Sequence, residues 1–229
     1  MTGQNRSSEE LIPKILFEDK HLVVVSKPAG LLSQGEKTGG ANLVDWAREY
    51  FGRNYVGLVH RLDRNTSGVM IIAKRSKSAE RLSEALSDGK LERWYLAWVH
   101  GTLTQPQTWT HFLLKNEKTN TVRIVNNANS GKKAVLTANP IARGAFEGNA
   151  LTLIEFKLET GRSHQIRVQS AHEGFSLLGD VKYGKPLQKS SFSRPALHSY
   201  RIRFPHPMTN EILVFEDFVP ADFSNIKKI

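Results

Sequence analysis

The residues best suited to chemistry lie in the segment His60–Lys74, which reads HRLDRNTSGVMIIAK. It places Asp63 between Arg61 and Arg64, just ahead of a Thr-Ser-Gly turn and an apolar run. Nearby positive charge favours an ionised carboxylate, so we expect Asp63 to stay charged. Such a carboxylate on a loop can act as a nucleophile or as a general base. Taken alone, the same residues are also typical of a capped turn, in which Thr66 and its serine neighbour bond the backbone.

The elements that flank this segment are predicted from apolar patterns. Two short strands, KILFE and HLVVVSK, are expected between Lys14 and Lys27, and a Pro-Ala-Gly turn ends the second. A buried strand is expected over Val69–Ala73. Helical spacing predicts one helix over 42–50, capped by Asn42 and stopped by Gly52, and another over 77–87, closed by Gly89.

Strands dominate the rest of the chain. The alternation of apolar and polar residues predicts further strands at Trp94–Val99, Thr121–Val125, Lys133–Asn139, Leu151–Leu158, Ala196–Phe204 and Ile212–Phe218. These strands outnumber the helices and do not alternate with them regularly. We therefore predict an α+β fold with a mixed, largely antiparallel central sheet that is flanked by helices and loops.

The composition limits the domain organisation and the kind of partner. A chain of 229 residues with 39% hydrophobic content can bury one sizeable core. We expect one domain over 13–222, with an N-terminal tail at 1–12 and a C-terminal tail at 223–229. The 32 basic and 22 acidic residues give a net charge of +10, which suits a polyanion such as nucleic acid. A generic basic surface explains the charge equally well.

Several classes of protein are disfavoured by residues that the sequence lacks. The absence of cysteine excludes disulfides and thiolate metal sites and favours the cytoplasm. No apolar run approaches the ~20 residues of a membrane span, and the N-terminus does not resemble a signal peptide. His172-Glu173 resembles the start of a zinc-binding helix, but Phe175-Ser176 stands where the second histidine is needed. We therefore expect no metal and no membrane association.

Six segments, in order along the chain, resemble one known family. They are LVVVSKPAGLLS at Leu22–Ser33, HRLDRNTSGVMIIAK at His60–Lys74, RWYLAWVHG at Arg93–Gly101, ETGRSHQIRV at Glu159–Val168, LLGDVKYG at Leu177–Gly184 and RPALHSYRIRFPHP at Arg194–Pro207. Together they resemble the RluA-type RNA pseudouridine synthases, and the likeness extends from about Ile15 to about Phe218.

The resemblance implies the isomerisation of a uridine in ribosomal RNA, transfer RNA or both to pseudouridine. In that reaction the bond between N1 and C1′ breaks and the ribose rejoins the base at C5. Asp63 matches the family's essential aspartate, which either attacks the substrate or removes a proton from C2′. The sequence leaves both routes open. The rearrangement is redox-neutral and implies no cofactor.

Two further catalytic residues are implied by the same resemblance. Tyr95 matches the tyrosine that packs on the target base and helps to remove the C5 proton, and an aromatic face suits base stacking. Arg167 matches the basic residue that pairs with the aspartate. Each has an alternative interpretation. Tyr95 alternates with buried neighbours and also fits a core position, while Arg167 also fits the solvated face of a short helix.

Four residues are candidates for substrate binding. Arg61 is expected to occupy the space that the flipped base vacates or to hold a phosphate. Leu197 matches an apolar contact under the uracil. Arg162 and His164 either touch RNA or satisfy loop carbonyls.

The expected partner is RNA, bound by a monomer that needs no protein partner. Some relatives carry an N-terminal S4-type RNA-binding domain, for which the residues before Ile15 leave no room. We expect target selection to depend on the catalytic domain itself. Two other classes remain open, a non-catalytic RNA-binding protein and a glycoside-cleaving enzyme. The second usually needs another acid beside Asp63, and none is evident.

Overall fold

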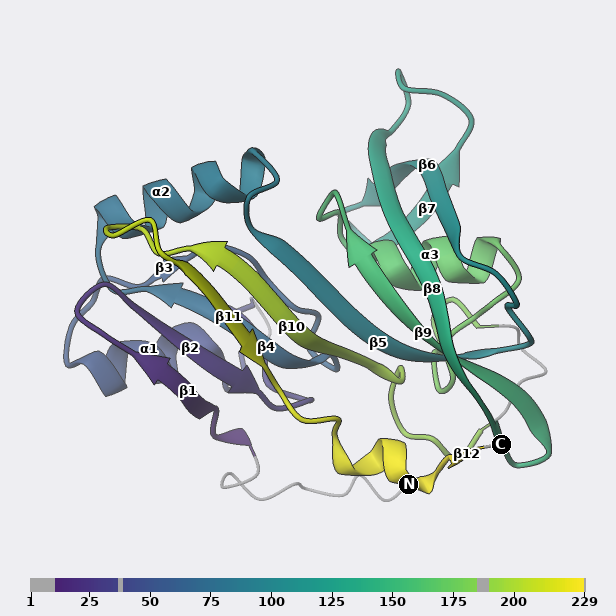
Figure 1. The fold of residues 1–229 in the computed structure, drawn as a ribbon. Helices are drawn as coiled ribbons and strands as arrows, with labels where there is room; N and C mark the ends of the chain where they lie inside the picture. Colours follow the sequence, from purple (N-terminus) through teal and green to yellow (C-terminus); the bar gives the residue numbers. More distant parts are fainter. Residues whose placement is uncertain (1–10, 37–38, 185–189, 229) are drawn as a thin grey trace. The chain divides into compact units, whose positions relative to one another are not determined.

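The computed structural model describes residues 11–36, 39–184 and 190–228, and Figure 1 shows the path of the chain. The chain divides into two compact units. Unit 1 comprises Met1–Glu92 and Ser199–Phe218, and unit 2 comprises Arg93–His198 and Val219–Ile229. The single domain expected over 13–222 stays a prediction. Most of the expected N-terminal tail at 1–12 lies outside the described residues.

Unit 1 contains several hydrogen-bonded strands of the sheet. Its strands, in spatial order, are β1 (Lys14–Glu18), β2 (Leu22–Lys27), β4 (Ser67–Ala73) and β10 (Leu197–Pro205), with β3 (Gly57–Leu58) on β4 and β11 (Ile212–Glu216) on β10. The pairs β1–β2, β2–β4, β3–β4 and β10–β11 are antiparallel. Strands β2 and β4 were both expected from their apolar runs, and their prediction is confirmed.

The core of unit 1 lies on both faces of β2 and β4. All seven residues of β4 are buried. One face, with Val24 and Ile71, packs against Leu82 of helix α2 (Ser76–Ser87). Residues of the opposite parity, such as Val25 and Met70, are equally inaccessible to solvent. The sheet is therefore covered on both sides, which explains why β4 reads as a continuous apolar run rather than an alternating one.

The two predicted helices of unit 1 are confirmed. In α1 (Leu43–Phe51) the side chain of Asn42 accepts a hydrogen bond from the Asp45 N–H at 3.0 Å, and Gly52 ends the helix in the left-handed conformation. Helix α2 begins one residue earlier than expected, and Gly89 follows its end with a φ of +71°.

Gly68 allows an unusually close approach of two strands in unit 1. Its φ is +116°, and a Cβ built there would lie 2.1 Å from the carbonyl oxygen of Ser199. The Ser199 hydroxyl in turn donates to the Val69 carbonyl at 3.2 Å. Only glycine fits this conformation and this gap. Gly68 therefore allows β4 and β10 to pack closely together. Strand β4 directly follows the Asp63 segment.

The strands of unit 2 pair in an antiparallel arrangement. In spatial order they are β5 (Glu92–His100), β9 (Asn149–Leu158), β8 (Lys132–Phe146), β6 (Gln107–Asn116) and β7 (Thr121–Val125), with β12 (Lys227–Lys228) on β8. Helix α3 (Gln165–His172) packs on these strands (Figure 1). Its Val168 belongs to one hydrophobic cluster with Leu113 of β6 and Ala134 of β8.

The residues expected to form a C-terminal tail at 223–229 adopt regular structure as far as they are described. They include the end of the short helix η2 (Ala221–Asn225) and strand β12, and Phe223 of η2 and Ile226, which follows it, are buried. Asp222 accepts two hydrogen bonds from the Arg194 guanidinium, at 2.6 and 2.9 Å. This segment is part of the packing of unit 2.

The predicted α+β fold class is confirmed, although some elements were not foreseen. Strands β3 and β12 have two residues each, too few to show a period. Helix α3 buries Gln165, Gln169 and Ser170 beside Ile166 and Val168, so its buried side is not a continuous apolar stripe. Among the described residues, no helix is long and apolar enough to cross a membrane.

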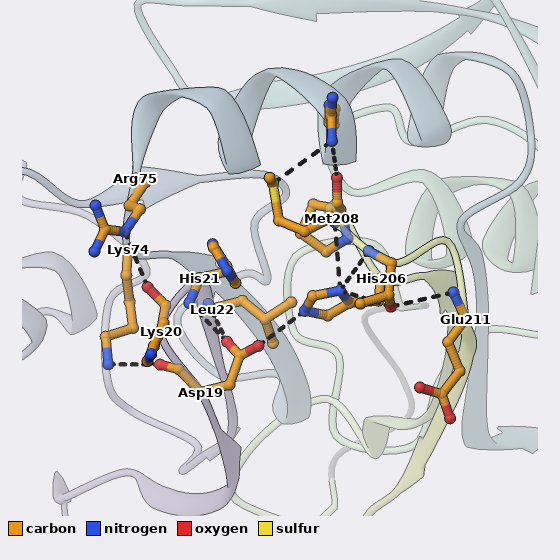
Figure 2. A network of polar contacts seen from close by, with 12 residues as sticks. Asp19, Lys20, His21, Leu22, Lys74, Arg75, His206, Met208 and Glu211 are labelled. Carbon is orange, nitrogen blue, oxygen red and sulfur yellow. Dashed lines mark hydrogen bonds and ion pairs between the residues drawn. The ribbon is translucent and has the colours of Figure 1, made fainter.

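A polar network joins two turns of unit 1 (Figure 2). Asp19, between β1 and β2, accepts hydrogen bonds from the N–H groups of His21 and Leu22 at 2.7 and 2.8 Å. Its second oxygen lies 2.8 Å from Nε2 of His206, which follows β10. Nδ1 of that ring accepts from the N–H of Thr209 at 3.1 Å. The network fixes the β10–β11 turn to the β1–β2 turn.

The network makes stability depend on pH. Burial raises the pKa of Asp19, but the N–H donors of Leu22 and His21, together with His206, outweigh it and hold this pKa below its usual range. A depressed carboxyl pKa contributes stability above the unfolded pKa of about 3.9 that is lost as pH falls through the folded value. We expect Asp19→Asn to lower the free energy of unfolding by about 1 kcal/mol at pH 7. In urea unfolding the difference should shrink below about pH 4, and a difference that is unchanged at pH 3 would contradict the assignment.

Candidate active site

The Asp63 loop, residues 59–66, connects β3 to β4 without regular secondary structure. The Ser33 hydroxyl donates to the Leu62 carbonyl at 2.7 Å and accepts from the Leu62 N–H at 3.0 Å. After Asp63 the chain turns, and the Thr66 N–H donates to the Asp63 carbonyl at 3.0 Å. The main chain is therefore held on both sides of the carboxylate.

A fully buried lysine also holds the Asp63 loop in place. Lys27 is 0% exposed, and its ammonium donates to the carbonyls of Pro28 at 2.9 Å, Leu31 at 2.7 Å and Arg64 at 3.2 Å. The Gly30 N–H also donates to the Arg64 carbonyl at 2.8 Å. A buried cation is tolerated only with such partners. Lys27 thereby ties the turn after β2 to the residue that follows Asp63.

Exposure alternates along the loop. Leu62 is buried, Asp63 is half-buried, and Arg61 and Arg64 are exposed. Arg64 donates from Nε to the Gly30 carbonyl at 3.1 Å. Arg61 thus lies at the surface two residues before the carboxylate, where a cation can meet a phosphate.

In unit 2, Tyr95 lies on β5 opposite Phe156 of β9 and is 5% exposed. Leu197, at the start of β10, is 4% exposed. Both side chains are therefore held in packed surroundings. The burial of Tyr95 fits a core position and equally fits a ring that supports a base.

Arg167 lies on α3 and forms a bidentate ion pair with Asp180. Its Nε and Nη2 donate to the two carboxylate oxygens at 2.7 and 2.8 Å, and the side chains are 11% and 1% exposed. The guanidinium also lies over the ring of Tyr183, with Cζ 5.1 Å from the ring centroid. The alternative that placed Arg167 on a solvated helix face is therefore wrong.

The Tyr183 hydroxyl connects Arg167 to His164. It accepts from the Val122 N–H at 2.9 Å and lies within hydrogen-bond distance, 2.6 Å, of Nδ1 of His164. His164 precedes α3 with a φ of +51°, a conformation that few side chains adopt. This contact fixes the imidazole at the start of the helix that carries Arg167.

Arg162 bonds the main chain. Its Nε donates to the Lys133 carbonyl at 2.9 Å, and its N–H donates to Oε1 of Gln165 at 3.0 Å. The guanidinium is exposed. The carbonyl that Arg162 binds belongs to strand β8 and not to a loop, and contact with RNA stays a prediction.

The predicted site residues fall in both units. Asp63 and Arg61 belong to unit 1, while Tyr95, Arg167 and the three predicted substrate-binding residues Leu197, Arg162 and His164 belong to unit 2. Within unit 2 the contacts of Tyr183 join Arg167 to His164. The pairing of Asp63 with Arg167 stays a prediction.

Four residues that support the site were assigned no role from the sequence, namely Lys27, Ser33, Asp180 and Tyr183. All four lie in segments that carried the family resemblance, LVVVSKPAGLLS and LLGDVKYG. In the sequence, these motifs were the signal that could have drawn attention to the four residues. What they could not show is that Lys27 and Ser33 bond the Asp63 loop, or that Asp180 holds Arg167.

The chain is similar in sequence and in fold to proteins of one known family. Residues 21–172 match the RNA pseudouridylate synthase family. An RNA pseudouridine synthase of Bacillus subtilis, YhcT, is 35% identical over 97% of this chain and 76% of its own length. Ribosomal large subunit pseudouridine synthase D of Zymomonas mobilis is 33% identical over 94% of this chain and 72% of its own. The structure of human RNA pseudouridylate synthase domain containing 1 is similar in fold, with a TM-score of 0.81, 21% identity and coverage of 96% and 89% of the two chains.

The chain therefore belongs to the RNA pseudouridylate synthase family, and its relatives place it among the RluA-type members. It is an isomerase that converts uridine in RNA to pseudouridine. Membership decides against the two rival classes, a non-catalytic RNA-binding protein and a glycoside-cleaving enzyme.

The role of Lys27 predicts a large effect on stability. Lys27→Met keeps the length of the side chain but leaves the Leu31 and Arg64 carbonyls without their ammonium donor. We expect the free energy of unfolding in urea to fall by about 2–4 kcal/mol. The matched control Lys77→Met, at an exposed position of α2, should change it by less than about 0.5 kcal/mol. Equal effects of the two substitutions would contradict the role of Lys27.

The pair of Arg167 and Asp180 generates a similar prediction for unit 2. Asp180→Asn leaves the guanidinium with a neutral partner, and we expect a loss of about 3 kcal/mol in the free energy of unfolding. Asp88→Asn is the matched control, because the Asp88 and Lys90 side chains are 54% and 66% exposed. Its effect should stay below about 1 kcal/mol. Thermal unfolding of both variants checks the comparison, and a wild-type melting temperature for Asp180→Asn would contradict it.

Proposed function

We propose that this enzyme modifies a uridine of ribosomal RNA and that Asp63 is its catalytic carboxylate. The observation that carries the proposal is the Asp63 loop, whose main chain is fixed by Ser33 on one side and by Lys27 on the other. A carboxylate on a restrained loop is preorganised for reaction. Transfer RNA is the alternative substrate.

The chemistry demands one carboxylate and no net gain or loss of atoms. Asp63 either attacks C1′ or takes the proton from C2′, and in both routes the bond from N1 to C1′ breaks. The uracil then turns and C5 bonds to C1′; this breaks the ester bond to Asp63 in the first route, whereas in the second route Asp63 returns the proton to C2′. The C5 proton then leaves, and N1 gains a proton. The product is an isomer of the substrate. The reaction requires no oxidant, reductant or cofactor.

Tyr95 and Leu197 are proposed to hold the base. A uracil must leave its stack to reach a carboxylate, which costs a few kcal/mol. Stacking on an aromatic ring is worth about 1–3 kcal/mol and offsets much of that cost. The phenol of Tyr95 is proposed to assist removal of the C5 proton. Burial of both side chains supports these roles, because a packed ring keeps its orientation.

Arg167 is proposed to pair with Asp63. Its Nε and Nη2 already bind Asp180, and a guanidinium carries five N–H donors. A cation fixed in this way favours the ionised form of a neighbouring carboxylate. Arg167 is then the central charge between two aspartates.

The exposed cations Arg61 of unit 1 and Arg162 of unit 2 are proposed to contact RNA phosphates, and His164, at the start of α3, is proposed to contact RNA as well. The net charge of +10 supports a polyanionic substrate. The choice of ribosomal RNA comes from relatives named as ribosomal large subunit synthases. We further propose that the enzyme acts as a monomer in the cytoplasm.

Activity on cellular RNA tests the proposal. RNA from a strain that lacks the enzyme is incubated with the wild type or with Asp63→Asn, and pseudouridine is mapped. The wild type should restore at least one ribosomal site, and Asp63→Asn should lower the rate by at least ~1000-fold because the carboxylate is gone. Asp88→Asn, an exposed carboxylate, serves as the control.

Two outcomes would count against the proposal. Restoration of transfer RNA sites alone would overturn the choice of substrate. Equal rates for the wild type and Asp63→Asn would overturn the catalytic role of Asp63.

A further inference from the structure

A cluster of metal-binding side chains lies in unit 2. It combines His111 of β6 with His172, the last residue of α3, and Glu173, which follows it. The ligand atoms of all three lie within 4.8 Å of one another. Across residues 11–36, 39–184 and 190–228, this is the one group of three or more potential metal ligands so arranged. The second histidine that a helical motif would place after Glu173 is supplied instead by a strand.

The spacing of the first two ligands already suits a metal ion. Nε2 of His111 lies 3.1 Å from Oε1 of Glu173. Two ligands of a tetrahedral zinc ion, at bonds of about 2.05 Å, are about 3.3 Å apart. The His172 ring stands edge-on to that of His111, with centroids 4.9 Å apart and an interplanar angle of 75°. His172 is exposed, so a rotation of its side chain can bring its nitrogen within bonding distance.

The residue behind His111 can select the tautomer that a metal needs. Nε2 of Gln169 lies 2.9 Å from Nδ1 of His111 and 3.2 Å from the Trp109 carbonyl. The amide oxygen of Gln169 is buried and has no hydrogen-bond partner. A half-turn of the amide gives up the contacts to the Trp109 and Ala134 carbonyls and lets this oxygen accept a hydrogen bond from Nδ1–H. The lone pair of Nε2 then faces Glu173, as in the outer shells of known metal sites.

We propose that His111, His172 and Glu173 form a binding site for a divalent transition metal of the zinc class, with water completing the coordination. Two imidazoles and one carboxylate are a ligand set that such ions favour over magnesium or calcium. The ion would tie the C-terminal end of α3 to β6. It is a structural site, separate from the isomerisation, which needs no metal.

Titration of the metal alone tests the proposal. Untagged protein is stripped with a chelator, dialysed and titrated with zinc chloride by calorimetry. We expect one ion per chain, and a melting temperature that rises with zinc concentration because the ion binds only the folded state. His172→Ala and Glu173→Gln should each weaken binding by at least ~10-fold. Glu80→Gln, at an exposed position of α2, is the matched control and should bind as the wild type does.

Cobalt provides an independent signal. Cobalt(II) bound at the site should give the visible absorption bands that are typical of an ion with a low coordination number. These bands should disappear in His172→Ala. The absence of zinc binding, or binding that both ligand substitutions leave unchanged, would overturn the proposal. Because no RNA enters these measurements, their failure leaves the proposed function untouched.

Discussion

The ammonium of Lys27 is the constraint on which the geometry of unit 1 depends. It is fully buried and bonds three carbonyls, two in the turn that follows β2 and one in the Asp63 loop. Removing a cation from water is expensive unless its donors are all used. The turn after β2 and the loop before β4 must therefore adopt the conformations that present their carbonyls to it. The catalytic candidate Asp63 is adjacent to the residue so held.

The corresponding constraint in unit 2 is the ion pair of Arg167 and Asp180. Asp180 is the more deeply buried partner, and it also accepts the N–H groups of Lys182 and Tyr183. These contacts hold the Asp180 carboxylate in the orientation in which it binds the guanidinium. In each unit a charged group near the proposed chemistry is thus oriented by a buried partner that has no chemical step of its own. Such support is what a preorganised site requires.

Much of the fold follows from local patterns in the sequence. Strands β2 and β4 are apolar runs, and α1 carries a side-chain cap at Asn42 and a left-handed glycine at Gly52. Helix α3 was not predicted as an element because Gln165 and Gln169 occupy its buried face, where they bond main-chain carbonyls. Strand β6 was also missed, although Trp109 and Leu113 point inward along it.

The residues of the candidate site could be predicted only where they match a position in a family motif. Asp63, Tyr95 and Arg167 come from segments whose order resembles one family. Their supports come from long-range pairings. Lys27 bonds Arg64 across 37 positions, and His111 meets Glu173 from a different element. No local period encodes such pairings, because they depend on how the strands and helices pack.

The central claim is that the carboxylate of Asp63 drives a rearrangement in which the uracil loses its C5 hydrogen. Release of tritium from RNA made with C5-tritiated uridine measures that loss directly. The wild-type enzyme should release tritium in step with pseudouridine formation, whereas a folded Asp63→Asn variant should release none above the background without enzyme. Equal release by both proteins would contradict the account.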